Sequence, residues 1–311
     1  MRPGLTYNLR PDTICLAALA ASALFDPDAV RRQLQQEAER VASRFAPARF
    51  ARPPAWAQRA DPPLATLAVL ADPHVDDSGK AAWTAPLRDR LLRAIRFLND
   101  AVKPQAVLLL GDLVAFEDAE QLRRVKALLD ANLAAPYHAV PGNHDGPGYE
   151  RVFGPRNHAF AVAGVRFIAI GITYWHWDSG WGNYDEMDWL AGQFAAHRGE
   201  PTIVLSHNPI ALPTFANNAA VLRLLDAQPA VLAVLAGHMH VDYEVRLAKV
   251  HLGMPMLARA PYAFKVLRVH PDCILVLTFE EAGGAYRQGA IYQKIDIPPG
   301  LAPRRAAAPA P

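Results

Sequence analysis

Side chains that commonly bind metals follow five short apolar runs of this chain. The runs occupy residues 64–70, 106–110, 137–140, 202–206 and 230–236. The segments after them read ADPHV, GDLV, GNHD, SHNP and AGHMH. They supply seven side chains of the metal-binding type: Asp72, His74, Asp112, Asn143, His207, His238 and His240.

Each segment is weak support on its own, because Asn, Asp and Gly are ordinary turn formers and a lone histidine more often makes a structural hydrogen bond. Five such segments in one order are hard to explain as turns. Packing His and Asp side chains together at buried strand ends is costly unless something pairs them. Imidazole, carboxylate and amide ligands without thiolate suit Mn, Fe, Zn or Co. Seven ligands with one shared carboxylate fit two ions better than one.

The composition limits the remaining classes of protein. The chain has 311 residues, 51% of them hydrophobic, which is enough for a large core. Charged residues make up 20% and the formal net charge is +2, so neither a nucleic-acid polymer as partner nor a disordered chain is implied. Only two cysteines are present, Cys15 and Cys273, too few for a disulfide framework or a thiolate zinc site.

The elements that must position the candidate ligands are strands alternating with helices. Continuous apolar runs of this length are typical of strands covered on both faces. Helical patterns lie near residues 87–99, 120–131, 186–197 and 218–227, while residues 159–170 and 241–292 are patterned as successive strands. This favours an α/β core extended by antiparallel strands, with two packed sheets and helices outside. Sites in such sheets form at the carboxyl ends of strands, so five strand ends can converge on one crevice.

The regions outside this pattern are expected to be an extension and a tail. Residues 1–63 are predicted to be an N-terminal helical extension and linker, with a helix over 26–45 that has Asp26 as N-cap and Pro27 in the first turn. Residues 64–297 are predicted to form the main domain. The Pro/Ala-rich tail, 298–311, is expected to be disordered.

The N-terminus leaves two interpretations open. Residues 14–25 (ICLAALAASALF) follow Arg2 and Arg10, and the run is shorter than the ~18 residues that a membrane span needs. It is either a buried helix or part of a secretory signal segment over residues 1–23. We expect a cytoplasmic protein, and a periplasmic or secreted one if the signal interpretation holds. No transmembrane segment is expected, and the oligomeric state is left open.

The ordered series Asp-x-His, Gly-Asp, Gly-Asn-His-Asp, His and Gly-His-x-His, over residues 64–281, resembles the calcineurin-like metallophosphoesterase superfamily. The resemblance implies a four-layer α/β/β/α sandwich of two mixed sheets flanked by helices. It implies two transition-metal ions (Mn, Fe or Zn), the first held by Asp72, His74 and His240. The second would be held by Asn143, His207 and His238, with Asp112 bridging both.

The resemblance also implies the catalytic residues. His144 would lie beside the phosphate as a stabiliser of the transition state or an acid for the leaving group, and Asp145 would orient His144. A water shared by two ions 3.5–4 Å apart, as is usual in such sites, has a lowered pKa and attacks phosphorus as a bridging hydroxide. The expected function is therefore hydrolysis of small phosphodiesters or phosphomonoesters by a dinuclear metal centre.

The closest branch of the superfamily is the bacterial cyclic-nucleotide and glycerophosphodiester phosphodiesterase-like one. Ala115 stands where purple acid phosphatases have a tyrosine, and GDLVAFE departs from the protein Ser/Thr phosphatase pattern. Asn208 stands where many enzymes of the branch have a second histidine, and Pro73 inside Asp-x-His is unusual. Both departures leave the cyclic-nucleotide substrate open.

Two further functions remain as alternatives, a pyrophosphatase acting on a nucleotide-linked lipid precursor and an inactive binding scaffold. A scaffold is expected to have lost ligands, whereas all seven positions and His144 are filled. The loop over residues 171–190 clusters Tyr174, Trp175, Trp177, Trp181 and Tyr184. These aromatic side chains either form a lid over the substrate or pack between a sheet edge and a helix.

Overall fold

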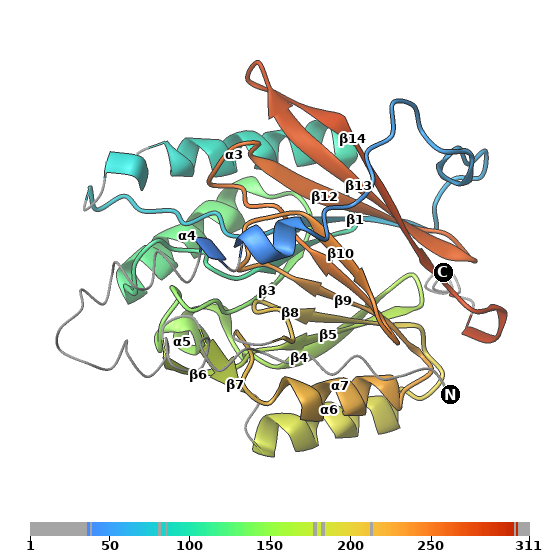
Figure 1. Ribbon diagram of the computed structural model, residues 1–311. Helices are drawn as coiled ribbons and strands as arrows, with labels where there is room; N and C mark the ends of the chain where they lie inside the picture. The colour runs from blue at the N-terminus through green and yellow to red at the C-terminus, as the bar shows by residue number, and fades with distance from the viewer. Residues whose placement is uncertain are drawn as a thin grey trace, which may run out of the picture. The chain divides into compact units, whose positions relative to one another are not determined.

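Figure 1 shows the computed structural model, which describes residues 36–37, 39–79, 82–84, 86–176, 179–181, 184–211, 214–301 and 303; within 174–185 only the backbone is described. The chain divides into two compact units, Met1–Val41 and Ala42–Pro311. Residues 36–37 and 39–43 are helical, in agreement with part of the helix expected over 26–45. The rest of that helix and the predicted signal segment 1–23 lie outside the described residues.

The first sheet of the larger unit has six strands in the order β14-β13-β12-β1-β2-β3. They are β1 (Ala65–Leu70), β2 (Ala106–Leu110), β3 (Tyr137–Val140), β12 (Ala263–Val269), β13 (Cys273–Ala282) and β14 (Ala285–Asp296). Strands β1 to β3 are parallel, and β12 pairs antiparallel with β1. Strand β13 pairs antiparallel with β12 on one side and with β14 on the other. The carboxyl ends of β1, β2 and β3 therefore lie at one edge of this sheet.

The second sheet also has six strands, in the order β10-β11-β9-β8-β5-β4. They are β4 (His158–Val162), β5 (Val165–Ile170), β8 (Thr202–Ser206), β9 (Val231–Ala236), β10 (Tyr243–Arg246) and β11 (Val250–Gly253). The inner strands β5, β8, β9 and β11 are parallel, while β4 and β10 are antiparallel to their neighbours. Strands β8 and β9 are buried along their whole length, which explains their unbroken apolar sequence.

Helices cover the outer face of each sheet. They are α3 (Leu87–Phe97), α4 (Ala119–Asn132), α5 (Tyr149–Phe153), α6 (Tyr184–Ala196) and α7 (Asn218–Asp226). Short helical turns occur at Ala55–Ala57, Ala82–Thr84, Leu98–Val102 and Pro299–Leu301. The side chain of Asp118 caps α4 by accepting hydrogen bonds from the backbone N–H groups of Glu120 and Gln121. No helix within the described ranges is both long and apolar enough to cross a bilayer.

Three apolar clusters define the layers, which can be followed in Figure 1. The central cluster joins the facing sides of the two sheets, for example Leu67 of β1 and Phe167 of β5. The next residue of β1, Ala68, points the other way into a cluster with α3 and α4. Strand residues such as Val204 pack in the same manner against α6 and α7. The predicted four-layer α/β/β/α sandwich is confirmed.

Described residues before and after the predicted main domain have contacts of their own. Residues predicted as a linker up to Pro63 belong to the compact unit that starts at Ala42. Phe50 packs edge-on against both Trp56 and Tyr292, and Arg49 pairs with Ile291 of β14. Of the tail 298–311, Pro299–Leu301 form a helical turn, and most of the remainder lies outside the described residues.

Two elements inside the domain were not predicted. The short helix α5 follows the GNHD segment directly, and its five residues are too few to show a helical period. The aromatic segment 171–190 contains a hairpin of β6 (Thr173–His176) and β7 (Ser179–Trp181) before α6, where a loop was expected. The side chains of Tyr174, Trp175, Trp177, Trp181 and Tyr184 lie outside the described part of the chain, whereas Trp189 of α6 packs against the apolar cluster of the second sheet.

Candidate metal centre

The seven predicted ligands lie together where the carboxyl ends of strands from both sheets meet. Asp72, Asp112 and Asn143 follow β1, β2 and β3 of the first sheet. His207 and His238 follow β8 and β9 of the second sheet. Six of the seven are buried, and only His240 is partly exposed. The convergence of strand ends expected from the sequence is therefore present in the structure.

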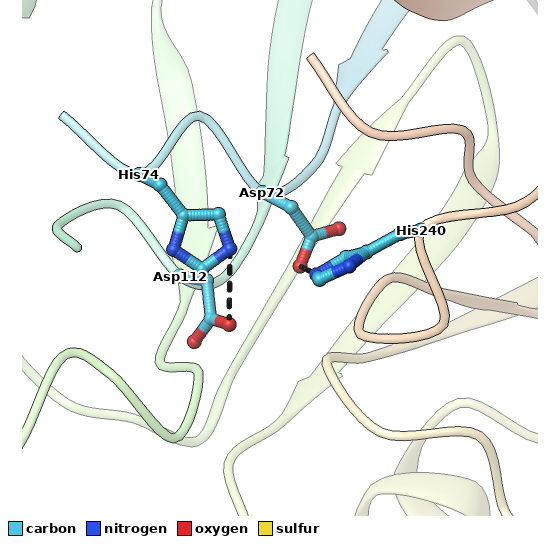
Figure 2. Close-up of side chains that lie close together, drawn as sticks. All are labelled: Asp72, His74, Asp112 and His240. Atoms are coloured by element: carbon cyan, nitrogen blue, oxygen red, sulfur yellow. Dashed lines mark ion pairs between the residues drawn. The ribbon is translucent and has the colours of Figure 1, made fainter. Parts of the chain in front are cut away.

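The first group of ligands consists of Asp72, His74, Asp112 and His240, as Figure 2 shows. One ligand atom from each residue lies within 4.8 Å of those of the other three. The Nε2 atom of His74 is 3.6 Å from Asp112 Oδ2, and Nε2 of His240 is 3.6 Å from Asp72 Oδ1. Two imidazoles and two carboxylates at such distances can coordinate one cation.

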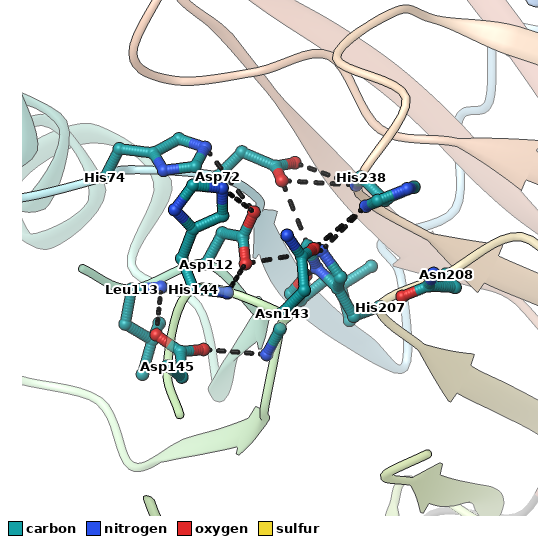
Figure 3. A network of polar contacts seen from close by, with 12 residues as sticks. Asp72, His74, Asp112, Leu113, Asn143, His144, Asp145, His207, Asn208 and His238 are labelled. Atoms are coloured by element: carbon teal, nitrogen blue, oxygen red, sulfur yellow. Dashed lines mark hydrogen bonds and ion pairs between the residues drawn. The ribbon is translucent and has the colours of Figure 1, made fainter. Parts of the chain in front are cut away.

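The second group consists of Asn143, His207 and His238, as Figure 3 shows. The amide oxygen of Asn143 is 3.1 Å from His207 Nε2 and 3.1 Å from His238 Nδ1. The two ring nitrogens are 3.3 Å apart. Three lone-pair donors thus point at one position, and a cation is the partner that can satisfy all three together.

Asp112 lies between the two groups. Its Oδ2 faces His74 of the first group, whereas its Oδ1 is 3.4 Å from Nε2 of His207 in the second group. A carboxylate can bridge two cations because each oxygen can serve one of them. The geometry fits the bridging role implied for Asp112 by the sequence.

Unpartnered polar atoms support a metal as the missing partner. Both ring nitrogens of His74 are buried and have no hydrogen-bond partner among the described residues, and the side chain is 3% exposed. An imidazole buried without partners is costly. A cation coordinated by Nε2 would remove part of that cost, so the residues present fit a metal pair.

Comparison with known proteins identifies the family. A model of calcineurin-like phosphoesterases matches residues 65–242, which include all seven ligands and more than half of the chain. The chain belongs to the calcineurin-like phosphoesterase family. The predicted class, a metallophosphoesterase, is confirmed at this level.

Two relatives of this phosphoesterase add detail. A cAMP/cGMP dual specificity phosphodiesterase of Mycobacterium tuberculosis is 26% identical over 192 residues, which are 55% of this chain and 60% of that protein. The chain thus matches about three fifths of the length of this relative. The crystal structure of a dimetal phosphatase from Danio rerio has a TM-score of 0.59 at 19% identity and covers 75% of this chain and 99% of its own. At that identity the likeness is one of fold.

Several residues of the candidate metal site have a strained backbone conformation. Five of the seven ligands have positive φ, a conformation that L-residues rarely adopt: Asp72 (53°), His74 (45°), Asp112 (51°), His238 (66°) and His240 (59°). Each such residue costs about 1–3 kcal/mol and persists only where the surroundings enforce it. The sharp turns that this conformation produces aim side chains from neighbouring strands at one point.

Glycines next to the ligands allow the strand ends to approach one another. A Cβ atom built on Gly142 would clash with the backbone N and the carboxylate of Asp112. A Cβ atom on Gly237 would lie 2.7 Å from the carbonyl oxygen of Leu110 and 3.0 Å from Asp72 Oδ2. Both glycines directly precede candidate ligands in the segments GNHD and AGHMH. Only the structure shows which atoms approach each glycine too closely for a Cβ atom.

His144 lies at the exposed side of the site. Its Nδ1–H donates to the carbonyl oxygen of Ala115 at 2.7 Å, which fixes the ring and, in the neutral form, leaves Nε2 without a proton. Nε2 is 3.9 Å from Asp112 Oδ2, and the side chain is 31% exposed. The ring therefore presents Nε2 beside the ligand groups, where a bound phosphate ester can reach it.

The Asp145 carboxylate has backbone groups as its hydrogen-bond partners. It accepts from the N–H groups of Leu113 at 2.7 Å, Val114 at 3.2 Å and Gly142 at 2.7 Å. It thus ties the GNHD turn to the GDLV turn, as Figure 3 shows for Leu113. The ring of His144 is held by the carbonyl of Ala115, a backbone group that leaves no signal in the sequence. The role predicted for Asp145, to orient His144, stays a prediction.

Asn208, which stands where many enzymes of the branch have a second histidine, makes a structural hydrogen bond. Its side chain is fully buried, and its Nδ2 donates to the carbonyl oxygen of Thr214 at 3.0 Å. This bond ties the residue after His207 to Thr214. His207 itself is fixed through Nδ1, which donates to the carbonyl of Leu110 at 2.7 Å and leaves Nε2 for a metal.

Metal binding to this site should depend strongly on pH. In the metal-free protein, burial raises the pKa of Asp72 to about 6. Burial opposes the charged form of His207, but Asp112 and Asp72 outweigh it and raise the pKa of the ring to about 9. Both groups bind protons below these values, and a cation must displace them. We therefore expect Mn²⁺ binding at pH 7.5 to release protons, and the affinity to fall by about tenfold per pH unit for each linked proton.

Isothermal titration calorimetry in two buffers of different ionisation enthalpy measures this proton release. Repeating the titration between pH 5 and pH 8 gives the change in affinity, which should be steepest below pH 6. A dissociation constant that stays constant over that range would contradict the assignment of these residues as ligands.

Proposed function

We propose that this protein is a two-metal phosphoesterase that hydrolyses small phosphodiesters or phosphomonoesters. The observation that carries the proposal is the position of Asp112, with one carboxylate oxygen toward each group of ligands. Two cations held by these groups would polarise the phosphoryl oxygens and lower the pKa of a water molecule. Mn, Fe and Zn all suit the donor set.

The residues of the chain supply position and a proton. Six of the seven proposed ligands are buried and only His240 is partly exposed, which keeps bulk water from competing for the cations. His144 is held through Nδ1 and keeps Nε2 beside the site, where the protonated ring can donate to a phosphoryl oxygen or to the leaving oxygen. Two divalent ions against two carboxylates leave excess positive charge, which favours an anionic ester without a strongly basic protein.

A cyclic phosphodiester is the first substrate to test. The Mycobacterium tuberculosis relative is a cAMP/cGMP dual specificity phosphodiesterase, and its likeness to this chain extends over 192 residues. The scaffold alternative is less well supported, because all seven ligands converge. The pyrophosphatase alternative depended on residues 14–25 and on the aromatic side chains of Tyr174, Trp175, Trp177, Trp181 and Tyr184, all of which lie outside the described part of the chain.

Replacement of His144 tests its role separately from metal binding. We expect His144→Ala to lower kcat by about 10²–10⁴-fold, the usual range for a general acid, while two cations still bind. His144→Gln, which retains a donor, should lose less activity. Steady-state kinetics together with metal analysis of each variant measures both effects. Equal kcat in wild type and His144→Ala would remove this residue from the mechanism.

A substrate panel tests the proposed function itself. The protein loaded with Mn²⁺ or Zn²⁺ is given bis(p-nitrophenyl) phosphate, p-nitrophenyl phosphate, cyclic AMP and a glycerophosphodiester. We expect turnover of at least one of them, with diesters compared against monoesters by kcat/KM. Absence of turnover on every ester by fully metal-loaded protein would refute the proposal and restore the scaffold alternative.

A further inference from the structure

A buried lysine stands in the central layer of the fold. Lys265 of β12 is fully buried, on the side of the strand that also carries Leu267 and Val269 of the central apolar cluster. Thr278 of β13 and Gln293 of β14 are equally buried and lie beside it on the neighbouring strands. The three strands lie side by side in Figure 1. Three buried polar side chains therefore lie together on the inner face of the first sheet.

The partner of this polar group comes from the second sheet. Asp242, directly before β10, receives hydrogen bonds from Lys265 Nζ at 2.7 Å to Oδ1 and 2.8 Å to Oδ2. The hydroxyl of Thr278 donates to the same carboxylate at 3.0 Å, and Lys265 also donates to Gln293. The ion pair thus joins the two sheets across the core.

Stability alone is a poor explanation for such a pair. Taking two charges out of water costs about as much as their attraction returns, so an apolar pair of similar volume is usually as stable. An apolar residue at position 265 would also continue the pattern of Ala263, Leu267 and Val269. The ion pair fixes the carboxylate of Asp242 at one position, which an apolar contact cannot do.

The fixed residue ends the loop that carries two metal ligands. Asp242 is two residues after His240 and four after His238. His238 belongs to the group with Asn143 and His207, whereas His240 belongs to the group with Asp72 and His74. One loop therefore serves both groups. Both histidines have positive φ, and such strain persists only where both ends of a loop are held.

We propose that the Lys265–Asp242 pair is a positioning device that holds the 237–242 loop so that His238 and His240 each face their own metal. This inference rests on the two-metal site proposed above. Strand β9 holds the loop at its start, and the ion pair holds it at its end. Without the pair the strained backbone can relax, and the two imidazoles move away from their positions.

Metal affinity separates positioning from mere stabilisation. The variants are Lys265→Met, which leaves the largely covered Asp242 carboxylate without its cation, and the double variant Lys265→Met/Asp242→Asn, which removes both charges and keeps an acceptor for Thr278. We expect the double variant to recover most of the thermal stability that Lys265→Met loses. Its Mn²⁺ affinity, measured by calorimetry on apo protein, should remain about 10-fold below wild type, the usual effect of losing an outer-shell partner.

The matched control is Glu281→Gln on β13. It breaks the ion pair of another little-exposed carboxylate, in which Glu281 Oε1 lies 3.1 Å from Arg93 Nε. We expect this variant to unfold at a lower temperature but to bind Mn²⁺ as wild type does. If the double variant does not fold, Thr278→Val, which removes one hydrogen bond to Asp242, should show a smaller loss of affinity.

Wild-type affinity in the double variant, or in Thr278→Val where the double variant does not fold, would overturn the positioning role. So would an equal loss in Glu281→Gln, since the effect would then follow stability alone. Fewer than two cations bound to the wild-type protein would be a different failure, because it would overturn the proposed function itself.

A second, independent feature is an exposed tryptophan at the rim of the metal site. Trp83 is 54% exposed, although tryptophan is usually well buried. Its ring centroid is 6.2 Å from that of His74 and 6.4 Å from that of Phe116. The next residue, Thr84, is fully buried and its hydroxyl donates to Asp76 at 3.0 Å, which anchors the segment. The indole is therefore held beside the site while much of it faces solvent.

We infer that Trp83 stacks on an aromatic or nucleobase group of the substrate. This inference rests on the proposed function and names its substrate class, an ester with an aromatic group next to the phosphate. The His74 ring, 4.8 Å from that of His144, connects the indole with the side of the site that His144 faces. Stacking on aromatic side chains favours any nucleobase, because every base has a π-face.

Binding of adenosine monophosphate and of inorganic phosphate to metal-loaded protein tests this inference without turnover. We expect Trp83→Ala to weaken nucleotide binding by about 10-fold and to leave phosphate binding unchanged, whereas Trp83→Phe retains most of the affinity. Leu247→Ala, at an equally exposed apolar residue (56%), is the control and should bind both ligands as wild type does. An equal change for both ligands, or no change, would overturn the role of Trp83. Failure of phosphate itself to bind wild type would count against the proposed function.

Discussion

Replacement of Asp112 by alanine should abolish the activity and remove most of the metal. Its two carboxylate oxygens lie 3.6 Å from His74 Nε2 and 3.4 Å from His207 Nε2, so a single substitution removes a ligand from both groups. We expect kcat/KM to fall by at least ~10³-fold, the upper range for loss of one preorganised electrostatic group. Elemental analysis after dialysis should find fewer than two cations per chain.

Asp112→Asn sharpens this prediction. Asparagine keeps one oxygen but replaces the other by an amide NH₂, which cannot bind a cation. One group of ligands should therefore survive, and the variant should bind one cation while losing the activity. Glu120→Ala, at an exposed carboxylate of α4, is the control and should match wild type. Two tightly bound cations and normal turnover in Asp112→Ala would exclude a bridging role for this residue.

Replacement of Gly111 by alanine should have the largest effect on folding. Gly111 has φ of +82°, and a Cβ atom there would clash with the imidazole of His207 and lie 2.8 Å from the backbone N of Gly142. Left-handed backbone costs an alanine about 1 kcal/mol, and overpacking a tight contact adds about 1–3 kcal/mol. We expect a total loss of about 2–4 kcal/mol in the free energy of unfolding, together with weaker metal binding.

Gly199 provides a control with the same backbone conformation. Its φ is +85°, but no atom lies within 4 Å of the position that its Cβ would take. Gly199→Ala should therefore show the backbone cost alone, about 1 kcal/mol, with unchanged metal affinity. Urea denaturation of both variants and calorimetric titration with Mn²⁺ measure the difference. Equal destabilisation by the two substitutions would show that close packing at position 111 is not important.

The positions of the strands could be predicted from the sequence because they are buried on both faces. All five apolar runs became strands, and their bounds differ from the expected ones by at most one residue. The cluster of candidate metal ligands followed from this, since residues just after parallel strands must meet at one edge. The same argument could not predict the direction in which each side chain of the cluster points. That direction depends on the backbone φ at residues such as Asp72 and His238.

The features missed by the sequence depend on groups without a local pattern. His144 is oriented by the carbonyl of Ala115, and any residue type could supply that carbonyl. The family resemblance implies that Asp145 orients His144; the partners that the structure adds for its carboxylate are backbone N–H groups 31 and 32 residues away. Lys265 and Asp242 are 23 residues apart and meet only because the two sheets pack face to face. Such contacts are set by tertiary structure.

Titration of the metal-free protein with Mn²⁺ is the most direct test of a two-metal phosphoesterase site. Bound metal per chain is measured alongside hydrolysis of bis(p-nitrophenyl) phosphate at each addition. We expect saturation at two cations per chain, with turnover appearing as the second cation binds. Saturation at one cation, or a protein holding two cations that hydrolyses no phosphate ester, would contradict the account.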